Sequence, residues 1–156
     1  MTQPPRAQIA AILNEGKDLT IATLRPDGAP QATTVSFASD GVAVFFGCGQ
    51  DSQKARNLAH DSRVAITVTL PYRDWAEILG LSISGRASEI RDPDEIARVG
   101  LMFMAKFPEV AQYVTGPEDS IVFFRVDPDV VSILDYSKGF GHTELVRLED
   151  AAVTAS

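Results

Sequence analysis

Apolar and polar residues alternate over several short segments of the chain, which is the pattern of β-strands with one buried face. The clearest example is 63–70, where Val64, Ile66 and Val68 share one face. The segment 42–46 is apolar at almost every position, so it predicts a strand covered on both faces. Five more strand segments are predicted at 19–24, 31–37, 78–90, 121–126 and 130–134.

Turn and helix signals separate these strands. The pairs Asp27-Gly28 and Asp40-Gly41 favour tight hairpin turns. Helices are predicted over 7–15, over about 51–60, and from Asp92, an N-cap residue, to about 107. Consecutive hairpins without regular βαβ alternation predict a mainly β fold, a closed antiparallel barrel of six to seven strands with about three peripheral helices.

Composition narrows the class of protein. With 156 residues, 45% of them hydrophobic, the chain suffices for a single domain, which we expect to span 1–150 with a loose tail at 151–156. The 14 basic and 21 acidic residues give a net charge of −7, which argues against nucleic acid and membrane as partners. One cysteine excludes an internal disulfide, no signal-peptide pattern is visible, and no apolar run approaches the roughly 20 residues of a membrane span. We therefore expect a cytoplasmic protein.

Several common chemistries do not fit this sequence. One cysteine and two histidines cannot complete a usual zinc site, so we expect no metal. The Gly-x-Ser-x-Gly motif of serine hydrolases is absent. The glycines ahead of Lys54 are similar to a phosphate-binding loop, but Gln53 and Ala55 replace the glycine and the hydroxyl residue that such a loop needs.

The segment 47–58 joins the apolar strand to a helix whose start carries an unusual charge. Asp51 or Ser52 can serve as N-cap by accepting a hydrogen bond from a free backbone N–H. Lys54 and Arg56 follow, although the positive end of a helix dipole favours acidic residues. A bound anion would resolve this conflict. The alternative is that both cations are solvated surface residues with Asp51 as counter-charge.

Four other residues each allow a structural or a functional interpretation. Cys48 is either a small buried residue or a reactive thiol beside a helix N-terminus. Trp75, the only tryptophan, packs against a cofactor or a partner chain, or else belongs to the core. His60 ends a predicted helix, where an imidazole suits the helix dipole. His142 lies in a glycine-hinged, partly aromatic loop and is a candidate for a site.

The order of elements and motifs resembles the pyridoxamine 5′-phosphate oxidase-like, FMN-binding split-barrel family. The resemblance rests on the hairpin 21–35, the apolar strand after it, and the segments 52–58, 63–68 and 82–87, and covers roughly residues 7–136. It implies a split β-barrel and a homodimer with two FMN sites at the interface, each using residues of both chains.

The resemblance also implies where the cofactor lies. The FMN phosphate is expected near Ser52, Gln53 and Lys54, and the flavin ring along 32–35 and 45–47. Arg56 of the same helix and the loop residues Trp75 and His142 are added as candidates on the grounds given above. The candidate cofactor-binding residues are therefore Ala32, Thr33, Thr34, Val35, Phe45, Phe46, Gly47, Ser52, Gln53, Lys54, Arg56, Trp75 and His142.

The sequence departs from the oxidase itself at its substrate ligands. Gln31 and Ser36 stand where basic ligands of the oxidase are expected, and no basic segment follows Tyr136, so the substrate is expected to differ from pyridoxamine phosphate. We expect an FMN-dependent oxidoreductase that transfers two electrons or a hydride between the flavin and a small organic substrate or reduced nicotinamide, without a catalytic side chain. The alternatives are a non-catalytic flavin- or haem-binding, stress-related protein, or a deazaflavin-dependent reductase.

Overall fold

The computed structural model describes residues 4–113 and 120–148, so the predicted tail at 151–156 lies outside it. The described chain is mainly β. Its helices are α1 (Pro5–Glu15), α2 (Gln53–His60) and α3 (Pro93–Lys106), with short 3-10 turns η1 (Trp75–Glu77), η2 (Pro108–Gln112) and η3 (Tyr136–Lys138). Its strands are β1 (Asp18–Leu24), β2 (Pro30–Ser36), β3 (Ala38–Asp40), β4 (Ala43–Gly49), β5 (Arg63–Thr69), β6 (Leu79–Glu89), β7 (Ile121–Asp135) and β8 (Thr143–Arg147).

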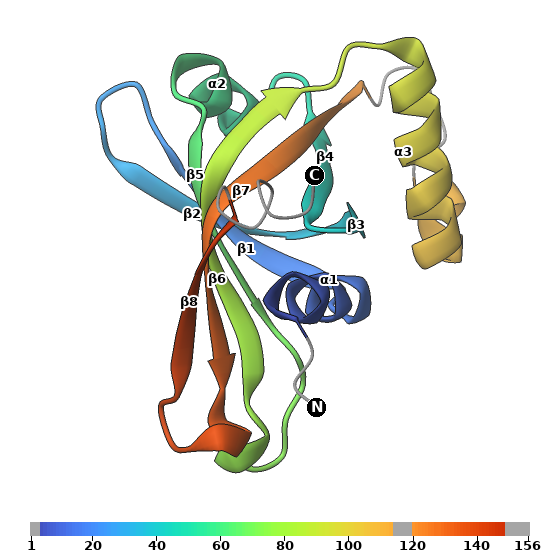
Figure 1. Cartoon of the computed structure of the whole chain (residues 1–156). Helices are drawn as coiled ribbons and strands as arrows, with labels where there is room; N and C mark the ends of the chain where they lie inside the picture. The colour runs from blue at the N-terminus through green and yellow to red at the C-terminus, as the bar shows by residue number, and fades with distance from the viewer. Residues whose placement is uncertain (1–3, 114–119, 149–156) are drawn as a thin grey trace.

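The strands form one curled antiparallel sheet in the order β2-β1-β5-β6-β7-β4-β3, with β8 paired to β7 off this path (Figure 1). Seven strands on the path and three α-helices confirm the predicted mainly β split barrel. The barrel is not closed by hydrogen bonds: within the described residues no ladder joins β2 to β3. The strands at the two ends of the sheet, β2 and β3, are joined by the single residue Phe37, which is too short a link for a hairpin. The chain itself therefore connects the two ends of the curled sheet.

Two details of the strands differ from the sequence prediction. The segments expected at 121–126 and 130–134 are one strand, β7, because Pro128 lies opposite Gly85, where the register of the β6–β7 pair shifts. A Cβ atom on Gly85 would lie 2.6 Å from the carbonyl oxygen of Asp127, so this close approach requires glycine. The Asp40-Gly41 turn joins β4 to the short β3, and not to β2.

The fourth strand is covered on both faces, as predicted. Val44 and Phe46 belong to the main core inside the curl, to which α1 contributes Ile9, Ile12 and Leu13. The other face of β4 packs in a second, smaller core, whose buried members are Ala43, Phe45, Ile90 and Val99. Helix α3 thus lies outside the barrel, where its residue Val99 packs against β4 (Figure 1).

Candidate functional site

The start of α2 forms a compact polar corner next to the end of β4. Ser52 is the N-cap, and its Oγ accepts a hydrogen bond from the backbone N–H of Ala55 at 3.2 Å. Arg56 is used internally, because its guanidinium donates to the carbonyl oxygen of Asp51 at 2.6 Å and to Oε1 of Gln53 at 2.8 Å. Of the two cations predicted to bind an anion, Arg56 therefore already has partners.

A hydrogen-bond network fixes α2 on the first hairpin. Asn57 is fully buried and accepts from Nε2 of Gln53 at 2.8 Å. Its own amide donates to Oγ1 of Thr23 at 3.0 Å and to Oε1 of Gln31 at 2.9 Å. Sequence analysis missed Asn57; the one available signal was a polar residue beside Leu58 on the apolar side of the helix. The network orients the helix start because each of its amides has a partner.

Lys54 is the exception in this corner. It is half-buried, and burial lowers the pKa of its ammonium group, an effect that nearby Cys48 offsets only in part. Within residues 4–113 and 120–148, no hydrogen bond or ion pair is made by its Nζ. A half-buried cation without a partner at a helix N-terminus is a favourable place for an anion.

A second polar atom in the same area also has no partner. Oγ1 of Thr33 is buried, and it makes no hydrogen bond to any described residue. By strand alternation Thr33 lies on the same face of β2 as Gln31, which holds Asn57, and Val35. The hydroxyl is therefore placed between the α2 network and the hollow described next.

A cavity of about 650 Å³ opens between the barrel and α3. Val35, Gly47 and Cys48 form its barrel wall, and Phe103 and Phe107 form part of its helix wall. The cavity wall includes Cys48 and Gly49 at the end of β4, and α2 begins four residues later at Gln53, so the cavity lies near the start of α2. A polar corner thus opens onto an apolar chamber of the size usual for small-molecule sites.

The predicted ring-binding strands present fewer side chains than expected. Val35 and Gly47 line the cavity, whereas Ala32 and Thr34 are exposed. The two phenylalanines are occupied elsewhere: Phe46 stacks on Phe124 with ring centroids 5.4 Å apart, and the centroid of the Phe45 ring lies 5.5 Å from the guanidinium of Arg98 and 5.8 Å from that of Arg125. Phe45 and Phe46 are fully buried, so of the predicted residues on β4 only Gly47 is available to a ligand.

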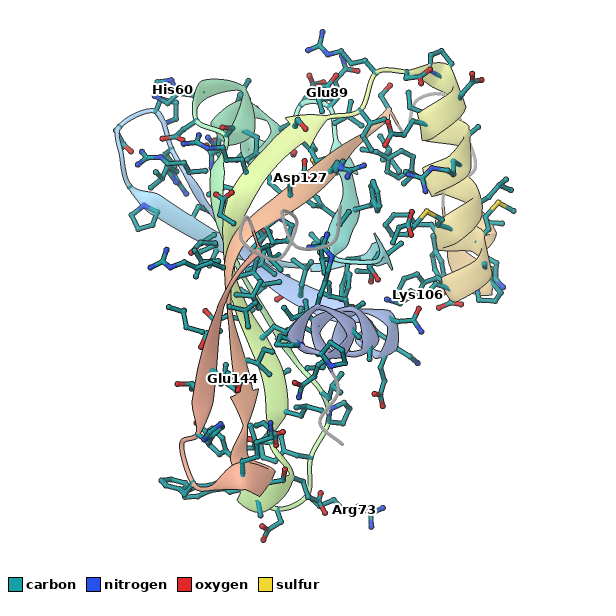
Figure 2. All side chains as sticks on the ribbon, viewed as in Figure 1. His60, Arg73, Glu89, Lys106, Asp127 and Glu144 are labelled. Carbon is teal, nitrogen blue, oxygen red and sulfur yellow. The ribbon has the colours of Figure 1, made fainter. Side chains whose placement is uncertain are left out.

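Trp75 and His142 lie at the opposite end of the molecule from α2. Figure 2 shows His60, the last residue of α2, at one end and Arg73, next to η1, at the other. Trp75 is 64% exposed, so the core interpretation is wrong; it stacks on Phe140, which is 78% exposed, with centroids 5.6 Å apart. His142 closes the nearby turn through its backbone, donating to the carbonyl oxygen of Gly139 at 3.0 Å.

Neither a cluster of candidate metal ligands nor a membrane-spanning helix is found in the part of the chain that is described. No three side chains among its His, Cys, Asp and Glu residues come close enough together to share a metal ion. None of the described helices combines the length and the apolar character that spanning a bilayer requires.

The curled antiparallel sheet, with a helix start and an apolar cavity at one end, assigns the chain to the class of split-barrel proteins. The chain belongs to the pyridoxamine 5′-phosphate oxidase family, whose sequence profile matches residues 5–135. Most of the described structure, from α1 to the end of β7, lies within this match.

Solved structures show the same fold in other proteins. A haem-binding protein from Mycobacterium smegmatis is similar at 22% identity and a TM-score of 0.80; the match covers 98% of this chain but 62% of that protein, so this chain spans less than two thirds of its length. The conserved hypothetical protein Rv2991 from Mycobacterium tuberculosis is 25% identical, with a TM-score of 0.74 and coverage of 92% of this chain and 96% of that one. HutZ, the haem storage protein from Vibrio cholerae, is 22% identical over 78% of this chain and 88% of its own, with a TM-score of 0.66. Curated proteins give no match to the sequence.

Proposed function

We propose that the protein is an FMN-dependent oxidoreductase, which moves two electrons or a hydride between the flavin and a small organic substrate or reduced nicotinamide. The observation that carries the proposal is Lys54, a half-buried cation without a partner among the described residues, at a helix start that adjoins an apolar cavity. A phosphate bound to a planar ring system matches both features, because the phosphate needs the cation and the ring needs the apolar walls.

The residues present fit such a cofactor. Lys54 and the N-terminal backbone of α2 would hold the phosphate by charge-assisted hydrogen bonds. The buried hydroxyl of Thr33 would hold a polar group of the cofactor, and Val35 and the backbone of β4 would support the ring. When bound, the flavin supplies the two-electron chemistry. The chain binds and orients it and keeps water from one face, and no side chain is assigned as acid or base.

Flavin is favoured over haem by the position of the histidines. The similar proteins from Mycobacterium smegmatis and Vibrio cholerae are described as haem-binding and haem storage proteins. In this chain neither His60, exposed at the end of α2, nor His142, at the far turn, lines the cavity. Histidine is a common haem ligand, so its absence from this wall favours a cofactor that is held by its phosphate. A deazaflavin would use the same phosphate corner.

The proposal includes a homodimer in the cytoplasm with cofactor sites at the interface. Trp75 and Phe140 form an exposed aromatic pair at the end opposite α2, the kind of surface that a partner chain covers. A second copy could bring this aromatic pair to the cofactor site, which one chain alone does not do. Sedimentation of the FMN-loaded protein as a monomer would exclude this part of the proposal.

The test is a titration of purified protein with FMN, followed by reduction. We expect quenching of flavin fluorescence at a one-to-one ratio of FMN to chain, and bleaching of the flavin absorbance by reduced nicotinamide that an added oxidant reverses. A protein that binds FMN but never turns over would identify a flavin carrier. A protein that binds haem and not FMN would overturn the proposal.

A further inference from the structure

We propose that the α3 side of the cavity binds the second reactant, and that this subsite takes uncharged aromatic molecules. The inference rests on the proposed function, because it concerns the partner of the flavin at the same site. Three independent features of the cavity carry it: the aromatic face of α3, a glycine in that helix that the fold does not require, and the lack of cationic side chains among the described wall residues.

One face of α3 is aligned with the cavity. Gly100, Phe103 and Met104 follow the i, i+3, i+4 spacing that places side chains on one helical face, and all three line the cavity together with Phe107, which directly follows the helix. Phe103 stacks on Phe123 of β7 with centroids 5.7 Å apart and on Phe107 at 6.1 Å. These rings form a continuous aromatic wall, against which a planar apolar molecule can stack.

Gly100 leaves space that no protein atom requires. It is the eighth of 14 residues in α3, where glycine is unfavourable relative to alanine. A Cβ atom on Gly100 would meet no atom within 4 Å, whereas on Gly80 or Gly85 it would lie 2.6 Å from a backbone oxygen. Fold geometry therefore explains glycine at positions 80 and 85 but not at 100. Since Gly100 lines the cavity, the vacant space belongs to a ligand.

The charges around the cavity exclude an anionic ligand at this subsite. Among the described residues no lysine, arginine or histidine lines it, and Glu109 is the one acidic residue of its wall. Lys106, on the same helix, is directed elsewhere, since its Nζ donates to the carbonyl oxygen of Leu13. Lys54 lies at the β4 end, where the proposed cofactor phosphate binds. A phosphate or carboxylate against α3 would be desolvated without a counter-charge, so a neutral molecule is favoured.

Binding of two related probes tests the subsite. We expect 2-naphthol, which is neutral at pH 7, to bind at least about tenfold more tightly than 2-naphthol-6-sulfonate, because the sulfonate adds an unpaired charge. Calorimetric titrations of the full chain, with and without FMN, measure both affinities. Equal affinity for the two probes, or tighter binding of the sulfonate, would overturn the proposal.

Substitutions at Gly100 locate the subsite. Gly100→Leu should weaken 2-naphthol binding at least about tenfold by filling the space, while Ala105→Leu, an exposed position of α3 outside the cavity wall, should leave it unchanged. Gly100→Ala should raise the Tm by about 2 to 4 °C through helix propensity and still weaken the probe severalfold. A Gly100→Ala protein that is less stable and binds 2-naphthol normally would assign the glycine to folding and reject the subsite.

The titrations separate this inference from the proposed function. Normal FMN affinity with no 2-naphthol binding would reject the subsite and leave the flavin proposal intact. Failure to bind FMN, with 2-naphthol still bound and sensitive to Gly100→Leu, would reject the flavin proposal and retain an aromatic ligand site on α3.

Discussion

Two half-buried lysines, Lys54 and Lys106, lie at different corners of the same chain and differ in one respect. Burial lowers the pKa of both ammonium groups. Lys106 has partners within the protein: its Nζ lies 3.3 Å from the carbonyl oxygen of Leu13 and 4.1 Å from the centroid of the Phe37 ring. Lys54 has no such partner within the described residues. The loss of hydration is thus compensated inside the fold for one lysine only.

The difference distinguishes a structural cation, Lys106, from the proposed binding cation, Lys54. Lys106 links α3 to α1 and to the junction of β2 and β3, so its charge contributes to the fold (Figure 2). The polar side chains that follow on α2, those of Gln53, Arg56 and Asn57, have partners within this corner. The corner is therefore held in place without Lys54, and we propose that a ligand supplies the partner that this lysine lacks.

The strongest test concerns the network that holds this corner. Asn57→Ala removes a fully buried amide and leaves Gln53 without its acceptor and Thr23 without its donor, so we expect a loss of about 2 to 3 kcal/mol in the free energy of unfolding. Urea denaturation measures the loss. Asn14→Ala, at an exposed position of α1, is the matched control and should stay within about 0.5 kcal/mol of wild type. A stable Asn57→Ala protein would mean that the helix start is held by other contacts.

Removal of the unpaired cation should affect the ligand and not the fold. Lys54→Ala is expected to weaken FMN binding by about 1.5 to 3 kcal/mol, the range for a hydrogen bond to a charged group. Riboflavin, which lacks the phosphate, should bind wild type and variant equally. Fluorescence titrations with the two flavins measure both effects. An unchanged FMN affinity in a folded variant would remove the phosphate from this corner.

Removal of the paired cation should have the reverse outcome. Lys106→Met keeps most of the apolar stem but loses the hydrogen bond to Leu13 and the contact with the Phe37 ring, so we expect a loss of about 1 kcal/mol of stability. Its affinity for FMN should equal that of wild type. Lys54→Met is the matched variant and should be at least as stable as wild type without ligand, because an unpaired half-buried charge is gone. Equal stability of the two variants would abolish the contrast between the lysines.

Sequence reasoning reached the features that depend on neighbouring residues. The two-sided burial of β4 follows from its unbroken apolar run, and the charge conflict at α2 follows from Ser52, Lys54 and Arg56 within one helical turn. Both were predictable because strand periodicity and helix capping are set locally.

Features that depend on distant partners were missed. The strand β7 continues through Pro128 only because Gly85 and a register shift on β6 lie opposite. Trp75 is exposed because η1 lies at the tip of the sheet, although a single tryptophan suggests a core residue. The role of Asn57 depends on Thr23 and Gln31, more than 25 positions away in the chain. None of these contacts leaves a periodic signal in the sequence.

The smallest expected effect is a pH dependence of FMN affinity to which Lys54 contributes and Lys106 does not. In the unliganded protein each lysine binds protons less tightly than in the unfolded chain, whose pKa is near 10.5. Between the lowered pKa of the folded protein and 10.5, the unfolded state binds more protons than the folded state. The contribution of each lysine to the free energy of unfolding therefore rises with pH in this window. A bound phosphate favours protonated Lys54 and raises its pKa again. FMN binding should therefore take up protons in this window, and FMN affinity should fall as pH rises through it.

Measurement of FMN affinity from neutral pH to about pH 10.4 checks this prediction, because lysines titrate towards the end of that range. Riboflavin corrects for ionisation of the shared ring. We expect a modest decline for wild type and for Lys106→Met, and a flat profile for Lys54→Met after the correction. Lys106 keeps the same partners in the free and bound protein, so its titration changes stability without changing affinity. A decline that persists in Lys54→Met would place the ligand's counter-charge on another residue, and the contrast between the two lysines would then not identify the binding cation.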